Sequence, residues 1–553
     1  MWNKEKIVVF IIVLTLGYSV YGQNTESIGQ EEFIDLSTSQ RIIFTGETLW
    51  FSVFSLNSQM QSSGSSLCLV ELVNSSNASV IRRKVALTDG RGESYLQFPD
   101  SLSTGIYTIL AYTSWMKNRD VQVLSKTKIA VINPNRVYEN NKREFETNNR
   151  FDNTGGFTEH KGVVFNKRAR VEVNKLLDLD NFSSGVYTLS VKRKEPDWFE
   201  DDNRYNPKAE ARINHVEYFP DYNGIVVSGV LFDSDDRAVT GAEVLLSLPG
   251  NGADLMSSVT NEKGKFYFLL DVETGDKDLV FTLPDAEMRI QLDNPFLHNI
   301  QLENNFDFHL DSTAQQYLKE KYFYNQLANK YGERVVEKTN TDTKEETDFT
   351  FYTTPNLSLY MDDYIRLDSL SEYFYELVPY VHFNRVKKDY QLQVINRKSK
   401  FALGDRPGVF IDGVLYTDFD EMAKMPVEDI DRIDVIWELY YYKDFTFDGI
   451  VSVYTKKANF YSVDLQGNMM RIVYPMTDRN NLRFKVKEYG SEKDANRNPD
   501  LRDLLLWKPF VDARDLPKLN FFTSDISGVY EISITGYTSS GERISYSTDF
   551  YVE

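Results

Sequence analysis

Residues 407–457 read PGVFIDGVLYTDFDEMAKMPVEDIDRIDVIWELYYYKDFTFDGIVSVYTKK, and this stretch decides the fold that we assign to the surrounding segment. Three short runs rich in β-branched residues are separated by Gly, Pro and Asp, a pattern typical of strands joined by tight turns. Asp412-Gly413 predicts a two-residue hairpin, because Gly adopts positive φ at little cost. Pro426 before Val427–Asp429 predicts one helical turn, with carboxylates near the positive end of its dipole.

This stretch resembles the plug domain of TonB-dependent outer-membrane receptors, in the variant common among Bacteroidetes. That family carries, in a fixed order, an I-D-G-v strand, a D-I-x-x-I-x-V turn and strand, and a G-v-i-x-v-x-T-K-K strand. The corresponding residues here are Ile411–Val414, Asp429–Val435 and Gly449–Lys457. The resemblance implies a small α/β domain, which we place at residues 350–460 and call the plug-like domain.

The chain departs from this family directly after the second motif. A Gly/Pro/Ala-rich turn is usual there, whereas this chain has the aromatic stretch Trp437–Phe445. Bulky aromatic residues do not readily adopt the backbone conformations of glycine, so this loop must be built differently.

The segment after the plug-like domain is short. A receptor barrel of about 22 strands at ~10 residues each needs more chain than residues 458–553 provide. We therefore expect a plug-like domain without the receptor barrel.

Composition predicts a multidomain, mainly β protein. A length of 553 residues allows several domains. Aromatic residues make up 14% of the chain, and such side chains pack well on pleated sheets. The net charge of -20, with no evident basic stripe, opposes nucleic-acid binding.

Residues 1–22 have the pattern of a secretory signal peptide. Lys4 and Lys6 precede the apolar run Ile7–Leu16, and small residues follow before Gln23. The apolar run is shorter than the ~20 residues that span a bilayer. We expect an exported protein, periplasmic or associated with the outer membrane, without a transmembrane segment of its own.

Residues 28–135 predict a β-sandwich, from strand-like runs spaced by Gly, Ser, Asn and Asp. Phe44–Phe51 and Phe98–Asn118 resemble the second macroglobulin-type domain of α-2-macroglobulin-like proteins, as found in Bacteroidetes members that also carry a plug-like region. The thioester motif of that family (Gly-Cys-Gly-Glu-Gln) is absent from the sequence. The single cysteine, Cys68, could be read as a nucleophile, but its apolar strand favours a buried core residue.

A short repeat predicts further sandwiches. Gly105-Ile106-Tyr107, Gly185-Val186-Tyr187 and Gly528-Val529-Tyr530 each open an alternating apolar run, as if a Gly turn led into a strand with a corner Tyr. We assign a second sandwich to residues 150–220 and a C-terminal sandwich to residues 462–553.

Residues 224–292 resemble the carboxypeptidase-regulatory-like domain, a transthyretin-like sandwich without catalytic residues. The resemblance rests on Val226–Asp233, Val239–Val244 and Thr260–Phe268. Asp233, Asp235 and Asp236 could bind calcium, although a solvated acidic turn explains them better.

Residues 300–349 predict a helix and a linker. The helix is expected over Asp311–Glu333, with Ser312 as N-cap and apolar residues at helical spacing, and the linker over Glu337–Asp348. The apolar residues of the helix are Tyr317, Leu318, Tyr322, Phe323 and Leu327.

The sequence gives no reason to expect an enzyme. The five histidines have no metal-site spacing, and no phosphate loop or nucleophile elbow occurs. We assign no catalytic, cofactor-binding or metal-binding residues, and we expect no cofactor.

We interpret the chain as a non-catalytic binding or scaffold protein of the Bacteroidetes envelope, an accessory of an outer-membrane transport or assembly complex. Expected partners are outer-membrane barrel proteins or other envelope proteins. Trp and Tyr dominate binding hot spots, so the candidate contact residues come from the aromatic stretch, although the loop could equally fold back into the core. These residues are Trp437, Tyr440, Tyr441, Tyr442 and Phe445.

Two alternatives remain open. A macroglobulin-like protease-binding protein would need a cleavable bait stretch, for which Glu337–Asp348 is the candidate. A cell-surface adhesin is compatible with the sandwiches, but no motif selects it.

Overall fold

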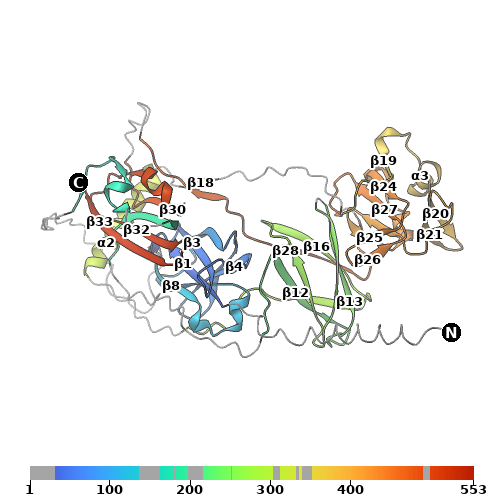
Figure 1. Cartoon of the computed structure of the whole chain (residues 1–553), viewed down its shortest axis with the longest axis horizontal. Coiled ribbons are helices and arrows are strands. Elements are labelled where there is room, and N and C mark those ends of the chain that lie inside the picture. The colour runs from blue at the N-terminus through green and yellow to red at the C-terminus, as the bar shows by residue number, and fades with distance from the viewer. Residues whose placement is uncertain are drawn as a thin grey trace. The chain divides into compact units, whose positions relative to one another are not determined.

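The computed structural model describes residues 31–135, 162–179, 182, 184–196, 216–250, 252–302, 312–331, 336–338, 351–461, 463–489 and 499–553. It is mainly β and divides into two compact units (Figure 1). Unit 1 comprises Met1–Gly224, Pro295–Asn340 and Thr477–Glu553, and unit 2 comprises Ile225–Asn294 and Thr341–Met476. The predicted signal peptide, residues 1–22, lies outside the described residues. No described helix is long and apolar enough to cross a membrane.

Unit 1 begins with a β-sandwich in the segment that resembles a macroglobulin domain. One sheet has the order β1-β3-β6 and the other the order β2-β8-β7-β4-β5. The elements are β1 (Glu32–Thr38), β2 (Ile42–Phe44), β3 (Thr48–Asn57), β4 (Leu67–Val73), β5 (Ser79–Ala86), β6 (Arg91–Gln97), β7 (Gly105–Tyr112), η1 (Trp115–Asn118), η2 (Val121–Val123) and β8 (Ser125–Ile132). Cys68 in β4 is fully buried, and this burial raises its thiol pKa to about 12, so it is a core residue.

A second sandwich in unit 1 combines two segments that are far apart in the sequence. Its main sheet has the order β30-β11-β32-β33-β9, and β10 pairs with β31. The elements are β9 (Val164–Phe165), β10 (Arg170–Glu172), η3 (Val173–Lys175), β11 (Gly185–Arg193), β30 (Leu504–Asp512), η8 (Ala513–Lys518), β31 (Asn520–Phe522), β32 (Gly528–Thr538) and β33 (Arg543–Val552).

This arrangement corrects the sequence-based domain boundaries. Residues 150–220 and 462–553 were expected to form two sandwiches, but β11 lies between β30 and β32 in one sheet. One buried core, with Tyr187, Leu189, Leu505 and Ile532 among its members, draws on both segments. Neither segment supplies enough strands alone, and local patterns do not specify which distant strand is the partner.

The repeated Gly-x-Tyr motif does mark a sandwich corner. The hydroxyl of Tyr107 donates to the backbone carbonyl of Ser103 at 2.9 Å, and that of Tyr530 donates to the carbonyl of Ile526 at 3.1 Å. Each acceptor lies four residues upstream, the arrangement of a tyrosine corner. The hydroxyl therefore fixes the loop that precedes the strand to the start of the strand.

Helix α2 (Ser312–Tyr331) begins at the predicted residue but buries a different face from the expected one. Tyr317 and Leu318 pack against the first sandwich, in a cluster with Ile42 and Ile132. In contrast, Tyr322 and Phe323 are exposed. The most buried long side chain of this helix face is Lys321, which has an exposed fraction of 2%.

Lys321 is buried because carboxylates from two other segments surround it. Its ammonium lies 2.6 Å from Asp503 and 3.5 Å from Glu47, and it donates to the carbonyl of Ile42 at 3.2 Å. Burial alone would lower the Lys321 pKa, but these carboxylates outweigh that effect and hold it well above the ordinary value. The Asp503 pKa is lowered, because the pairing with Lys321 outweighs its own burial. This charge cluster joins α2 to both sandwiches.

Part of the predicted linker is ordered. The short strand β18 (Val336–Lys338) pairs antiparallel with β29 (Leu482–Phe484), so Glu337 belongs to a strand. The rest of the predicted linker and bait stretch, residues 339–348, lies outside the described residues.

Unit 2 contains a sandwich over the segment that resembles a carboxypeptidase-regulatory-like domain. Its sheets have the orders β15-β12-β17 and β14-β13-β16-β28. The strands are β12 (Ile225–Phe232), β13 (Glu243–Leu248), β14 (Asp254–Val259), β15 (Lys265–Leu270), β16 (Asp276–Thr282), β17 (Arg289–Leu292) and β28 (Met469–Pro475). Strand β28 was expected in the C-terminal sandwich, but it pairs with β16 instead.

The plug-like domain is built on a mixed sheet of order β19-β24-β27-β22-β23, in which β22 and β27 are parallel. Two further hairpins, β20-β21 and β25-β26, accompany it. The elements are β19 (Leu357–Tyr360), η5 (Met361–Asp363), α3 (Leu370–Glu376), β20 (Val381–Val386), β21 (Asp389–Val394), β22 (Gly408–Ile411), β23 (Val414–Leu415), α4 (Phe419–Met422), η6 (Val427–Asp429), β24 (Ile430–Ile436), β25 (Tyr440–Tyr442), β26 (Phe445–Phe447) and β27 (Ile450–Thr455).

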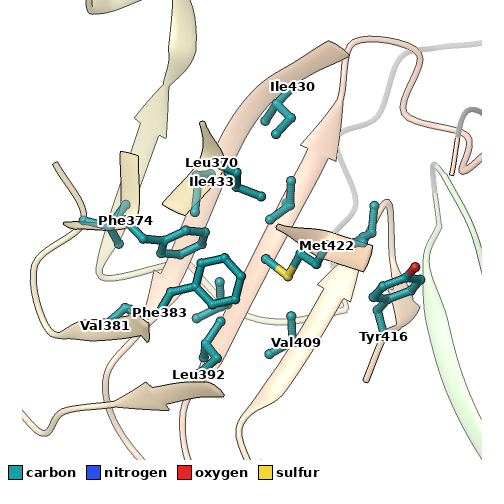
Figure 2. Packing of buried hydrophobic residues seen from close by; sticks show 14 of the residues in the cluster. Leu370, Phe374, Val381, Phe383, Leu392, Val409, Tyr416, Met422, Ile430 and Ile433 are labelled. Carbon is teal, nitrogen blue, oxygen red and sulfur yellow. The ribbon is translucent and has the colours of Figure 1, made fainter. Parts of the chain in front are cut away.

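Both faces of this sheet are covered, by two different clusters. Figure 2 shows the first, where α3, α4 and the β20-β21 hairpin contribute to the same core as Val409 and Ile433 of the sheet. The rings of Phe374 and Phe383 meet there edge to face, with centroids 5.2 Å apart. Alternate residues of the strands, such as Phe410, belong to a second cluster that includes β25 and β26 residues.

The Asp412-Gly413 turn forms as predicted, and its aspartate has a structural role. Both residues have positive φ, 48° and 87°, as a two-residue primed hairpin requires. The buried carboxylate of Asp412 accepts hydrogen bonds from the Thr455 backbone N–H (2.7 Å), the Thr455 hydroxyl (2.6 Å) and the Phe460 N–H (2.8 Å). Burial raises the Asp412 pKa in spite of these donors. The turn is thereby fixed to the end of β27.

We predict that Lys321→Met destabilises unit 1 by about 3–5 kcal/mol, because Asp503 and Glu47 lose their cation in a buried site. Hydrogen–deuterium exchange of the α2 amides measures this loss. The matched control is Lys319→Met on the exposed side of the same helix, with an expected change within about 0.5 kcal/mol.

The Lys321→Met effect should also depend on pH. The lowered Asp503 pKa gives stability that is present above its unfolded value of about 4 and is lost as the pH falls through the folded value. The difference between wild type and variant should therefore shrink below about pH 4. A difference that grows on acidification contradicts this assignment.

We predict that Asp412→Asn destabilises the plug-like domain by about 1–3 kcal/mol, because the amide cannot accept from all three donors and leaves one buried N–H unsatisfied. Asn tolerates the positive φ, so backbone strain does not contribute. The urea midpoint of this domain, followed by hydrogen exchange of β22 and β27, measures the loss. Asp431→Asn, at an exposed position on β24, should leave the midpoint unchanged.

Candidate functional site

The candidate site is the hairpin β25-β26, which the aromatic stretch Trp437–Phe445 forms together with Phe447. Its strands pair Tyr440 with Phe447 and Tyr442 with Phe445, and Lys443 in the turn has a φ of 48°. Aromatic side chains favour strands, so the run of tyrosines forms an extended hairpin in place of a flexible turn. The five predicted contact residues lie in or next to this hairpin.

Trp437 is not a surface contact in this structure. Its exposed fraction is 8%, and it belongs to the first core cluster, together with residues of α3 and β21. Its ring meets the ring of Tyr380 edge to face with centroids 5.1 Å apart, and the guanidinium of Arg397 lies 5.8 Å from its centroid. Trp437 therefore anchors the start of the hairpin, which corrects its predicted role.

Tyr440, Tyr442 and Phe445 are half-buried against the opposite face of the sheet. They pack on the second core cluster, which contains Phe410 and Ile436. Phe351 lies between them and the sheet, with ring centroids 4.9 Å from Tyr442 and 4.6 Å from Phe410. These three aromatic residues therefore bury most of their apolar surface within the domain. This is the arrangement expected of a loop that folds back into the core.

Two polar contacts fix the hairpin to β14 within unit 2. The hydroxyl of Tyr442 donates to Asp254 at 2.6 Å, and the Lys443 ammonium lies 2.6 Å from the same carboxylate. Burial, with the hydrogen bond to Asp254, raises the pKa of Tyr442, which keeps its hydroxyl a donor. The hairpin is consequently a fixed element of unit 2.

Tyr441 is the predicted contact residue that remains available at the surface. It alternates with its buried neighbours in β25, and its exposed fraction is 69%. A rigidly held tyrosine offers a large amphipathic contact at a low cost in conformational entropy. The arrangement can supply a binding contact to a partner.

The acidic residues Asp233, Asp235 and Asp236 are engaged with arginines in this structure. The described residues contain no group of three or more His, Cys, Asp or Glu side chains that could hold a metal ion. Asp233 accepts hydrogen bonds from the Asp235 and Arg237 backbones and pairs with the Arg237 side chain, while Asp236 pairs with Arg289. The three carboxylates therefore lie in a turn in which Arg237 and Arg289 are their cationic partners. His160, His215 and His309 lie outside the described residues.

Sequence reasoning missed Phe351 and Asp254 as parts of this site. Both lie far from the hairpin in the sequence, Asp254 in another domain, and neither belongs to a motif.

No protein-family model matches the chain, and no curated protein matches it. Among solved structures, trypsin-activated α-2-macroglobulin from Escherichia coli is similar over 95% of this chain and 42% of its own, at 9% identity and a TM-score of 0.24. The native conformation of E. coli α-2-macroglobulin is similar over 95% and 40%, at 8% identity and a TM-score of 0.24.

A third similar structure is the CARDB domain of the PF1109 protein from Pyrococcus furiosus. It covers 20% of this chain and 98% of its own, at 11% identity and a TM-score of 0.13. The chain spans about two fifths of the length of the macroglobulins that it matches. Because these overlaps are so low, no functional argument rests on them.

We predict that Tyr442→Phe loosens the hairpin by about 0.5–1.5 kcal/mol, because the hydrogen bond to Asp254 is lost while the ring packing remains. Trypsin cleavage after Lys443 under native conditions should then become about three- to tenfold faster. Tyr441→Phe is the matched control, since its exposed hydroxyl makes no contact with the described residues, and it should leave the rate unchanged. Equal rates for wild type and Tyr442→Phe would contradict the role of Asp254.

Proposed function

We propose that the chain is a non-catalytic, exported binding protein of the bacterial envelope, an accessory of an outer-membrane transport or assembly complex. Its proposed partner is an outer-membrane barrel protein, and the contact includes Tyr441. The resemblance of residues 407–457 to receptor plug domains motivates the choice of partner and compartment.

The observation that carries this proposal is the construction of the β25-β26 hairpin. A glycine-rich turn is replaced by a hairpin that is packed on Phe351, tied to Asp254 and capped by one outward tyrosine. Binding contacts that are held rigidly lose little entropy on association. Such an element supports a recognition role better than a catalytic one.

The macroglobulin-like alternative has weaker support as a covalent trap. Cys68 is buried in β4 with a raised thiol pKa, so it cannot provide a reactive thioester. Non-covalent protease binding would depend on cleavage within Glu337–Asp348, most of which lies outside the described residues. A cell-surface adhesin has no residue-level support beyond the sandwiches themselves.

We predict that the tagged chain, purified from native envelopes in mild detergent, carries a stoichiometric outer-membrane barrel protein. Tyr441→Ala should reduce its recovery about tenfold or more, in line with the loss of a hot-spot aromatic. Tyr375→Ala is the matched control, because Tyr375 on α3 is also exposed, at 78%, but lies outside the hairpin.

The triple variant of Tyr440, Tyr441 and Tyr442 is less informative, because two of these residues pack into the domain. Recovery of the chain alone, or with a soluble protease, would overturn the accessory role. Recovery of the barrel protein at equal yield with Tyr441→Ala would retain the partner but remove Tyr441 from the contact.

A further inference from the structure

The loop between β21 and β22 forms a compact projection. A β-bridge between Ile395 and Ala402 closes its base, and the Asn396 N–H donates to the carbonyl of Phe401 at 2.9 Å. The Asn396 side chain accepts from the backbone N–H groups of Lys398 (2.9 Å) and Ser399 (3.1 Å). Every residue from 397 to 402 is exposed. We call residues 396–402 the cationic loop.

The loop carries three cations, two of which lie over aromatic rings. The Lys400 ammonium lies 4.6 Å from the ring centroid of Tyr380, and Arg397 lies over Trp437, which itself contacts Tyr380. Such cation–π contacts hold both charges near one ring pair. Within the described residues, neither these two cations nor Lys398 forms an ion pair with a carboxylate. The loop therefore presents net positive charge to solvent.

The backbone under this loop adopts a costly conformation. Tyr380 has a φ of 66° and Lys400 a φ of 63°. Positive φ is an outlier for a bulky residue, and outliers of this kind gather where structure serves a binding site. Lys400 also donates to the Tyr380 hydroxyl at 3.3 Å, and this hydrogen bond lowers the Tyr380 pKa. Tyr380 and Lys400, both with positive φ, thus fix the position of the Lys400 ammonium.

The wider segment has a charge opposite to that of the chain. Residues 385–406 contain seven Lys or Arg and two Asp, a net charge of +5, while the whole chain has a net charge of -20. The sequence showed no basic stripe because these cations lie at both ends of the β20-β21 hairpin, separated by strand residues. In the fold they form two groups, one at the turn of this hairpin and one in the cationic loop at its other end.

An exposed ring lies directly beside the charges. Phe401 follows Lys400 in the chain, and its exposed fraction is 75%. Phe401 belongs to neither core cluster of the domain. An apolar ring next to several cations on a surface is the composition of segments that lie in a membrane interface.

We propose that the cationic loop docks the plug-like domain on the surface of an anionic lipid bilayer. Arg397, Lys398 and Lys400 contact the phosphate groups of the lipids, and Phe401 enters the boundary between headgroups and acyl chains. Long cationic side chains suit this position, because their aliphatic stems follow the apolar ring while the charge stays at the headgroups.

The shape of the loop favours a bilayer over an acidic protein. An acidic protein with fixed carboxylates requires a complementary surface, whereas mobile headgroups rearrange around a projection. An exposed phenylalanine such as Phe401 gains burial from an acyl-chain boundary without needing a preformed pocket. This inference is independent of the barrel partner, because it uses other residues and needs no second protein.

The test is co-sedimentation of the chain from Gln23 onward with lipid vesicles. The first 22 residues are omitted, since the run Ile7–Leu16 would itself bind lipid. Vesicles of phosphatidylcholine with about 30 mol % phosphatidylglycerol should bind the chain, and vesicles of phosphatidylcholine alone should not. Raising the salt from about 0.05 M to about 0.5 M should release it, because exposed charges are screened.

Variants locate the contact. Changing Arg397, Lys398 and Lys400 together to Gln should weaken binding to the vesicles about a hundredfold. Each substitution removes the attraction of one cation to the anionic lipid surface. Phe401→Ser should weaken it about tenfold at any salt concentration, since that contribution is apolar. The matched control changes Lys424, Lys456 and Lys457, which are exposed cations of the same domain, to Gln.

Several outcomes would overturn the proposal. One is equal vesicle binding by the loop variant and the control variant, with both folded by circular dichroism. Another is binding that does not depend on the anionic lipid. Binding of a fluorescent polyglutamate peptide, without binding of anionic vesicles, would assign the loop to an acidic polypeptide instead.

Discussion

Unit 1 depends on the pairing of β11 with β30 and β32. The central strand comes from residues 185–193, and its two neighbours come from residues 504–538. More than three hundred residues must be closed into a loop before this sheet exists, which costs conformational entropy. The shared core, with Tyr187, Leu505 and Ile532 fully or almost fully buried, offsets that cost. The buried charges around Lys321 then join α2 to the same assembly.

In unit 2, too, a sheet is completed by a strand from a distant part of the sequence. Strand β28, residues 469–475, completes the sheet that β16 began at residues 276–282, and the whole plug-like domain lies between them in the sequence. The C-terminal end of the plug-like domain therefore leads directly into a strand of the sandwich, whereas the chain before the domain passes through residues 295–340 of unit 1. A binding element on such a framework is positioned by packed strands, which is more precise than a position at the end of a free linker.

Local features were predictable from the sequence, whereas contacts between distant segments were not. The Asp412-Gly413 hairpin, the turn after Pro426 and the start of α2 follow from residue conformations that a few neighbours determine. The single sandwich of unit 1 was divided into two, because strand patterns do not name their partners. Lys321 was overlooked because its carboxylates come from residues 47 and 503.

The candidate site shows the same division. The aromatic stretch was chosen from its composition, but its burial depends on Phe351 and Asp254, which no pattern connects to it. Trp437 and Tyr441 have similar local surroundings in the sequence, yet one is buried and the other exposed. Which of the two side chains is buried depends on the packing against the sheet.

The late closure of both units has a consequence for the order in which the protein can fold. During synthesis or transport from the N-terminus, β11 emerges long before either of its neighbours and leaves two unsatisfied edges. Contacts of such high sequence separation also form slowly. The first sandwich of unit 1 can fold early, since its strands are contiguous in the sequence, but the second must wait for nearly the last residue. The buried face of β11 therefore stays uncovered until residues 504–538 are available to pair with it.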